Sequence, residues 1–325
     1  MRLFALEGSL ELGRGIANAM DTVLDAHEER NFEDGEHKIR PLINVRDEDA
    51  YVIHSLHATK HQSVNDKLCK LLFFIATLKD AGARRVTAVV PYLCYARKDR
   101  RTKARDPVTV RYVAGLFESV GTDRIVTVDV HNMQAFQNAF RCNTEHIEAQ
   151  KLFVSYFQQI LKSGQDVVVM SPDIGGVKRA ELFRDKLSRG LSRPVDFAFM
   201  EKLRSKDVVS GETVVGDVSG KHVIILDDLI SSGTTMARAA DACVQQGAVA
   251  VNVVATHAAF SPKAVEVLRS QSISQVVVTN TISPLEMNDR SSVQKVIVLD
   301  IAPLLGEVIR RLHTSGSIVT LMEME

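Results

Sequence analysis

Two adjacent aspartates followed by small polar residues carry the clearest chemistry in the sequence. The stretch VIILDDLISSGTT runs from Val223 to Thr235, with Asp227 and Asp228 after an apolar run typical of a buried strand. In open α/β sheets ligands bind beyond the carboxyl ends of strands, where paired carboxylates can accept hydrogen bonds from vicinal sugar hydroxyls or hold a cation. The residues that follow the pair are suited to hold an anion at a helix N-terminus: Ser231, Ser232, Gly233, Thr234 and Thr235.

Together these residue types predict a site for a phosphorylated sugar. The simpler alternative, an N-capped helix that follows a strand, explains the hydroxyls but not the two like charges side by side.

Short apolar runs that alternate with helical patterns must position this site. The predicted strands are 52–55, 86–91, 125–130, 167–171, 223–226, 249–256, 276–280 and 296–299. A helix is predicted over 64–81, and Met236, Ala239, Ala240, Cys243 and Val244 form a helical stripe after the acidic pair. Asp106-Pro107 and Ser261-Pro262 are each typical of an N-cap followed by proline at the first helical position. This alternation predicts an α/β fold with mainly parallel sheets flanked by helices.

Length and a weak internal similarity indicate two similar domains. A chain of 325 residues is long for one core. The segments GARRVTAVV (82–90) and GAVAVNVVA (247–255) share a glycine, an alanine and two valines in register. We expect an N-terminal domain over 1–148 and a C-terminal domain over 149–299. The last helix, within 300–325, should pack back on the first domain through one apolar face.

Composition narrows the class of partner. Lysine and arginine total 40, as do aspartate and glutamate, so no overall charge attracts nucleic acid or an anionic membrane. The four cysteines lie far apart, which argues against a zinc site or a disulfide framework. The start of the chain has no signal-like apolar core, and no stretch reaches membrane-spanning length. We expect a cytoplasmic protein.

The stretch 223–235 resembles the 5-phosphoribose-binding loop of the type I phosphoribosyltransferase fold. Further segments resemble ribose-phosphate diphosphokinases and stand in the order of that family: NFEDGE (31–36), PYLCYARKDRR (91–101), VDVHNMQ (128–134), SPDIGGVKRA (171–180) and EKLR (201–204). The resemblance covers nearly the whole chain. It implies two domains of that fold, with the ATP segments in the first and the ribose 5-phosphate loop in the second.

The resemblance assigns nucleotide and metal contacts that the residues alone leave open. The ATP-site residues it implies are Phe32, Asp34, Glu36, Arg97, Lys98 and Asp99. Phe32, Asp34 and Glu36 would reach the adenine site of a neighbouring subunit, which implies a homo-oligomer built from dimers, with a hexamer as one form. His131 and Asp173 would hold Mg²⁺, the implied cofactor. Taken alone, the segments are also compatible with a turn, a solvated basic face and a surface histidine.

The implied reaction transfers the diphosphoryl group of MgATP to the C1 hydroxyl of ribose 5-phosphate. Lys202 and Arg204 would lie on a mobile flap and stabilise the transferring charge, although a plain surface hairpin also fits these residues. Two alternatives stay open: a phosphoribosyltransferase, and a catalytically silent regulatory homologue. Lys98 and Ser231 stand where many relatives have glutamine and a third acid.

Overall fold

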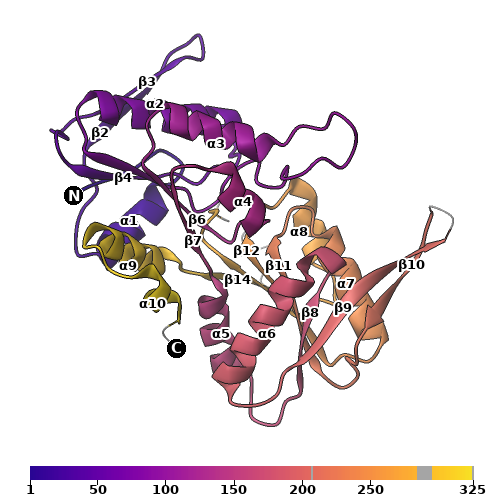
Figure 1. Cartoon of the computed structure of the whole chain (residues 1–325). Coiled ribbons are helices and arrows are strands. Elements are labelled where there is room, and N and C mark those ends of the chain that lie inside the picture. Colours follow the sequence, from indigo (N-terminus) through magenta and orange to yellow (C-terminus); the bar gives the residue numbers. More distant parts are fainter. Residues whose placement is uncertain (206–207, 284–294, 324–325) are drawn as a thin grey trace. The chain divides into compact units, whose positions relative to one another are not determined.

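The chain folds into two α/β units, drawn in Figure 1. The computed structural model describes residues 1–205, 208–283 and 295–323, and for 202–205 and 208–212 it describes the backbone alone. Unit 1 comprises 1–148 and 300–323, and unit 2 comprises 149–299. None of the helices in the described part of the chain combines the length and hydropathy of a membrane span.

Unit 1 is built on a five-stranded parallel sheet. Its order is β1 (Arg2–Ala5), β4 (Asp49–Ile53), β5 (Arg85–Val89), β6 (Arg124–Val128) and β7 (Asn143–Ile147). The helices of this unit are α1 (Leu10–Ala19), α2 (Val64–Asp80), α3 (Thr109–Ser119), α4 (Met133–Ala139), α9 (Ala302–His313) and α10 (Ile318–Glu323). A two-stranded hairpin, β2 (His27–Asn31) with β3 (His37–Pro41), completes it.

Every residue of β4 is buried, because apolar and β-branched side chains cover both faces of an inner parallel strand. One face packs against α2 and α3. The C-terminal helix α9 packs against α1, and its Leu305, Val308, Ile309 and Leu312 are buried.

Unit 2 is built on a seven-stranded sheet. Its order is β10 (Val208–Val215), β9 (Asp196–Ser205), β8 (Val167–Ser171), β11 (His222–Leu229), β12 (Ala250–His257), β13 (Gln275–Thr279) and β14 (Val296–Leu299). Among the described strand pairs of this sheet, β9–β10 alone is antiparallel. The helical segments are α5 (Gln150–Ile160), the 3-10 turn η1 (Ile174–Gly176), α6 (Val177–Leu191), α7 (Thr234–Gln245) and α8 (Pro262–Leu268). The α/β architecture with mainly parallel sheets confirms the predicted fold class.

Of the two N-cap and proline pairs predicted to start helices, the structure confirms one. Pro262 opens α8 behind the N-cap Ser261, as predicted. The predicted cap at Asp106 is wrong, since α3 begins at Thr109 with Val108 at the N-cap. The Asp106 carboxylate instead accepts hydrogen bonds from the backbone N–H groups of Thr102 and Lys103, so it closes the preceding loop.

A reciprocal capping box begins α2 and gives a local stability prediction. The Ser63 hydroxyl accepts from the Asp66 N–H at 3.2 Å, and the Asp66 carboxylate accepts from the Ser63 N–H at 2.8 Å. Ser63→Ala should cost about 1 kcal/mol, which speeds amide exchange in the first turn of α2 roughly fivefold. Ser119→Ala, which removes a hydroxyl that bonds the Leu116 carbonyl near the end of α3, is the control and should leave α2 exchange unchanged. Equal exchange in wild type and Ser63→Ala would contradict the capping account.

Candidate active site

The carboxyl ends of β8 and β11 meet at one edge of the sheet in unit 2. These strands pair directly, with His222 opposite Val167 and Ile225 opposite Met170. Asp173 follows β8, and the acidic pair lies near the end of β11. The strand continues to Leu229, so the prediction that it ends at Leu226 was too short. Asp227 and Asp228 are the two residues before Leu229, the last residue of the strand, so they belong to the sheet rather than to a loop.

A single arginine nitrogen bridges the two aspartates. Arg179 Nη1, from α6, donates to Asp227 Oδ1 at 2.8 Å and to Asp228 Oδ1 at 3.0 Å. The Asp228 N–H also donates to Asp227 Oδ1, at 2.8 Å. The Asp228 side chain is 3% exposed and that of Asp227 is 25% exposed. The like charges are therefore compensated by a partner that the sequence reading did not assign.

The bridge also separates the two ligand hypotheses for this pair. In the part of the chain that the structure describes, Asp227 Oδ2 accepts no hydrogen bond. A guanidinium cation already lies between the carboxylates, so a metal ion there would meet a like charge. The arrangement favours hydrogen bonds from sugar hydroxyls.

Burial of Asp227, followed by the charge of Asp228, raises the pKa of the Asp227 carboxyl to about 7, and Arg179 acts in the opposite direction. Because the folded-state pKa exceeds the unfolded value, protonation of this group favours the folded state. Its contribution to stability therefore grows as pH falls from about 7 towards about 4. If Asp227 binds sugar hydroxyls, as the sequence predicts, binding follows the reverse sign, because only the ionised carboxylate has both oxygens as acceptors.

We predict that kcat/KM for the sugar phosphate that the resemblance implies falls as pH drops through about 7. In the Asp227→Asn variant this fall in kcat/KM should be absent. The remaining fall, near pH 6, should be the one due to the second ionisation of the substrate phosphate. Steady-state kinetics from pH 5.5 to 8.5 would check the prediction, with those limits chosen to span about a unit and a half on each side of the pKa. Superimposable pH profiles for wild type and variant would show that Asp227 does not titrate in the reaction.

The loop after the acidic pair is fixed by its own hydroxyls and by glycine geometry. Gly233 has φ +74° and is the N-cap of α7, and a Cβ there would lie 3.2 Å from the Leu268 side chain. The Ser232 hydroxyl donates to the Thr234 hydroxyl at 3.1 Å, and the Ser231 carbonyl accepts from the Ser261 N–H at 3.0 Å. Ser231 and Thr235 are exposed. The loop thus presents Ser231 and Thr235 to solvent at the N-terminus of α7, where a phosphate could bind.

Asp173 lies in a second tight turn of unit 2. Its Oδ1 accepts from the Gly176 N–H at 3.0 Å, and the Ser171 hydroxyl donates to the Asp173 carbonyl at 2.6 Å. A Cβ on Gly176 would lie 2.7 Å from the Ser171 hydroxyl, so only glycine fits without a shift. No hydrogen bond to Asp173 Oδ2 occurs within the described residues. A carboxylate oxygen of this kind is a suitable ligand for Mg²⁺.

In unit 1 a hydrogen bond joins the basic segment to the histidine segment. Asn132 Nδ2 donates to Asp99 Oδ2 at 2.7 Å, while Asn132 Oδ1 caps α4 by accepting from the Ala135 N–H. His131 precedes this asparagine directly and is exposed, as are Arg97 and Lys98. The structure therefore brings Asp99 and the His131 loop together, which the sequence reading did not foresee. Asn132 lies in the segment VDVHNMQ, but an asparagine there could equally be the N-cap of a helix or a residue that binds a ligand.

The pairing of His131 with Asp173 remains a prediction. His131 belongs to unit 1 and Asp173 to unit 2, and each unit is described by itself. Within the described residues no group of three or more histidine, cysteine, aspartate or glutamate side chains is arranged around a metal position.

Phe32, Asp34 and Glu36 lie in the turn between β2 and β3, which extends away from the sheet and helices of unit 1 (Figure 1). The Phe32 N–H donates to the Glu36 carbonyl at 2.8 Å, and the Glu36 N–H donates to Asp34 Oδ1 at 3.1 Å. Gly35, at φ +90°, closes this turn. The Phe32 ring is 39% exposed, with the Arg30 guanidinium 5.2 Å from its centre. The tip therefore presents an aromatic face and two carboxylates to solvent.

Lys202 and Arg204 lie on β9, opposite Glu212 and Val209 of β10. The β9–β10 pair forms a long arm that extends beyond the rest of the unit 2 sheet (Figure 1). Their side chains are outside the described part of the structure, so the structure leaves their proposed role as a prediction.

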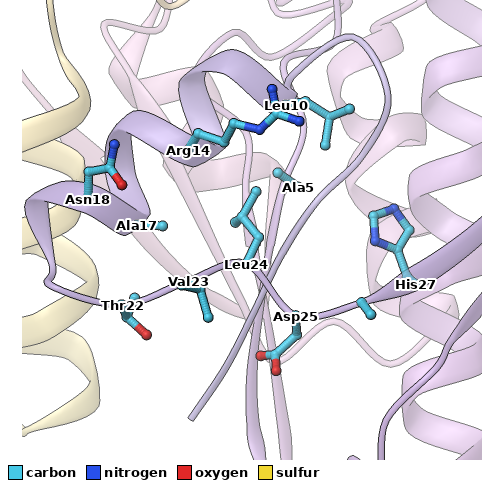
Figure 2. A pocket seen from close by; sticks show the side chains of 11 residues that line it. Ala5, Leu10, Arg14, Ala17, Asn18, Thr22, Val23, Leu24, Asp25 and His27 are labelled. Atoms are coloured by element: carbon cyan, nitrogen blue, oxygen red, sulfur yellow. The ribbon is translucent and has the colours of Figure 1, made fainter.

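A hollow of about 360 Å³ in unit 1 is separate from all of these residues. Figure 2 shows Arg14 and Asn18 of α1 on one side of it and Val23, Asp25 and His27 on the other. None of the predicted site residues lines it, so it does not correspond to the predicted ATP or sugar site.

Comparison with known proteins places the chain in a family. Residues 1–121 match the family model for the N-terminal domain of ribose phosphate pyrophosphokinase, and residues 198–323 match that for the phosphoribosyl synthetase-associated domain. A ribose-phosphate pyrophosphokinase from Bacillus caldolyticus is 35% identical over 99% of this chain and 98% of its own length. One from a Nostoc strain is 37% identical over 98% of this chain and 92% of its own.

The crystal structure of phosphoribosylpyrophosphate synthetase from Mycobacterium smegmatis gives the same result. It has a TM-score of 0.87 and 37% identity, and the match covers 97% of this chain and 99% of that chain. Fold and sequence together define an α/β enzyme of the phosphoribosyl synthetase class. The chain belongs to the ribose-phosphate pyrophosphokinase family, which confirms the motif resemblance.

Proposed function

We propose that this enzyme transfers the β,γ-diphosphoryl group of MgATP to the C1 hydroxyl of ribose 5-phosphate. The oxygen of that hydroxyl attacks the β-phosphorus, and the bond from this phosphorus to the oxygen shared with the α-phosphorus breaks. AMP leaves with that oxygen, the hydroxyl proton is released, and 5-phosphoribosyl 1-diphosphate forms. The observation that carries the proposal is the bridged aspartate pair beside the α7 loop, in a chain that matches the family along its length.

In this proposal the sugar is held by unit 2. Asp227 and Asp228 accept hydrogen bonds from the ribose hydroxyls, and residues 231–235 hold the 5-phosphate at the start of α7. Both elements are anchored to one sheet, because β11 pairs with β12 from His222 to Leu229 and with β8 from His222 to Ile225. The sugar is thus oriented before the diphosphoryl group arrives, which lowers the entropic part of the barrier.

The nucleotide is assigned to residues of unit 1. Arg97 and Lys98 contact the phosphates, Asp99 is positioned by Asn132, and a Phe32 from a neighbouring subunit stacks on adenine while its Asp34 and Glu36 accept from the amino group. His131 and Asp173 would hold Mg²⁺, and the mixed nitrogen and oxygen donors leave positions for water and phosphate. The bound cation would neutralise charge on the phosphate oxygens.

Lys202 and Arg204 stabilise the negative charge that develops on the transferred group, and no residue acts as a covalent nucleophile. Closure of the β9–β10 arm would exclude water, which otherwise would hydrolyse ATP. The shared use of Phe32 makes the active enzyme a homo-oligomer. All four thiols are free, the state that the reducing cytoplasm maintains, which supports a cytoplasmic location.

One product assay separates this proposal from its alternatives. The purified enzyme is incubated with ribose 5-phosphate and MgATP, and nucleotides and sugar phosphates are separated by anion-exchange chromatography. The proposal expects AMP and phosphoribosyl diphosphate in equal amounts. A phosphoribosyltransferase would instead consume phosphoribosyl diphosphate in a parallel reaction with nucleobases, and a silent homologue would form none of these products across metals and phosphate concentrations.

A further inference from the structure

Arg179 is a charged residue whose side chain bonds both aspartates of the sugar site. It is the third residue of α6, which packs against β8 and β11, so its side chain reaches the strand ends from the helix start. The residue lies in the segment SPDIGGVKRA but received no role from the sequence reading. We propose that Arg179 is a positioning residue for ribose 5-phosphate, which clamps Asp227 and Asp228 in the geometry that receives the sugar hydroxyls.

The clamp acts on a defined oxygen of each carboxylate. Arg179 Nη1 donates to Oδ1 of Asp227 at 2.8 Å and to Oδ1 of Asp228 at 3.0 Å. The Asp228 N–H also donates to Asp227 Oδ1. Two contacts on Oδ1 fix the rotation of the Asp227 carboxylate, so Oδ2 is the oxygen left to a ligand. A charge-assisted bond of this length orients its acceptor strongly. The arginine therefore fixes the direction from which a hydroxyl can donate.

The clamp also provides the countercharge that the pair needs. Burial and mutual repulsion disfavour two ionised carboxylates in adjacent positions, and a fixed cation opposes both effects. Arginine stays charged throughout the working pH range, so this support does not depend on pH. At 21% exposure for Arg179 and 25% for Asp227, the cluster is open enough for a ligand to reach it.

The position of Arg179 links the sugar pair to the turn that holds Asp173. The Asp173 carboxylate caps η1, whose last residue Gly176 is followed at once by α6. One short segment therefore carries a predicted metal ligand at its start and the clamp at its end. The orientation of α6 is fixed by this turn, which keeps the guanidinium aligned with the end of β11.

This inference rests on the proposed function, and the test separates the two. Wild type, Arg179→Gln and Arg179→Lys are assayed for AMP formation with ribose 5-phosphate varied at saturating MgATP. Arg184→Gln is the matched control, because Arg184 lies on the same helix and bonds its neighbour Asp185. We expect Arg179→Gln to raise the KM for ribose 5-phosphate at least tenfold with kcat within threefold of wild type. The lysine variant should have a KM between those of wild type and Arg179→Gln, since it keeps the charge but places it on a flexible chain instead of a planar guanidinium.

A second readout tests positioning rather than general stability. Discrimination against 2-deoxyribose 5-phosphate, which lacks one hydroxyl, should weaken in Arg179→Gln and remain in Arg184→Gln. A KM for ribose 5-phosphate in Arg179→Gln that equals the wild-type value would overturn the inference, whether or not kcat falls. If Arg179→Gln does not fold, Arg179→Lys alone decides the test. A KM for ribose 5-phosphate at the wild-type value in Arg179→Lys then overturns the inference. If wild type itself forms no AMP, the proposed function fails instead.

Discussion

Lys202→Ala is expected to lower kcat about 100- to 1,000-fold while the protein stays folded. The proposal gives this lysine the charge that develops on the transferred diphosphoryl group, so its loss acts on the transition state more than on substrate binding. KM values for MgATP and ribose 5-phosphate should change much less than kcat. The residue lies on β9, in the two-stranded arm of unit 2.

Steady-state kinetics and a thermal melt on the same preparation test this prediction. Lys263→Ala serves as the control, since Lys263 is an exposed lysine of α8 in the same unit. A melting temperature within 2 °C of wild type, about the shift that 1 kcal/mol causes in a protein of this size, would show that the fold is intact. Near-normal turnover in Lys202→Ala would remove this residue from the mechanism.

Phe32→Ala is expected to raise the KM for ATP about 10- to 100-fold, the range for loss of one base-stacking aromatic side chain. The ring stands exposed at the tip of the β2–β3 hairpin, where it contacts Arg30 but no hydrophobic core. An aromatic side chain in such a place stabilises its own fold little and is available to a ligand. The control is Tyr112→Ala, which removes an exposed aromatic side chain of α3 and should leave the KM unchanged.

A mixing experiment tests whether Phe32 serves a neighbouring subunit. Phe32→Ala and Lys202→Ala are combined, dissociated and reassembled. If one subunit supplies Phe32 and another supplies Lys202, random reassembly should restore about a quarter of the sites. If each chain builds its own complete site, the mixture should show only the average of the two variants.

The sequence predicted the buried strands well because their apolar runs are continuous. The strand 167–171, which is buried throughout, has the predicted bounds. So does 296–299, an edge strand that is apolar but only partly buried. The strand β7, with the sequence NTEHI, was not predicted, since an edge strand needs no continuous apolar run. The internal similarity at Gly82 and Gly247 reflects the same local backbone conformation at both places. Both glycines have left-handed φ angles, +87° and +88°, after a helix and before a strand.

The site was predictable at the level of residue types but not of partners. The acidic pair and the glycine of the α7 loop stood out because their combination is costly without a ligand. Arg179 could not be predicted, because the distance from α6 to the end of β11 depends on the packing of the helix against the sheet. The sequence presented the two aspartates as partners of sugar hydroxyls or of a cation, whereas the structure adds a guanidinium from the chain itself to both.

The most direct test of the central claim is a ³¹P NMR time course of the enzyme with MgATP and ribose 5-phosphate. The account predicts that a sugar-linked diphosphate, AMP and nothing else grow at equal rates as ATP and the sugar phosphate decline. The accumulation of ADP would mean transfer of a single phosphoryl group, and inorganic diphosphate with AMP would mean hydrolysis. Either result, or a spectrum that does not change with time, would contradict diphosphoryl transfer to the C1 hydroxyl.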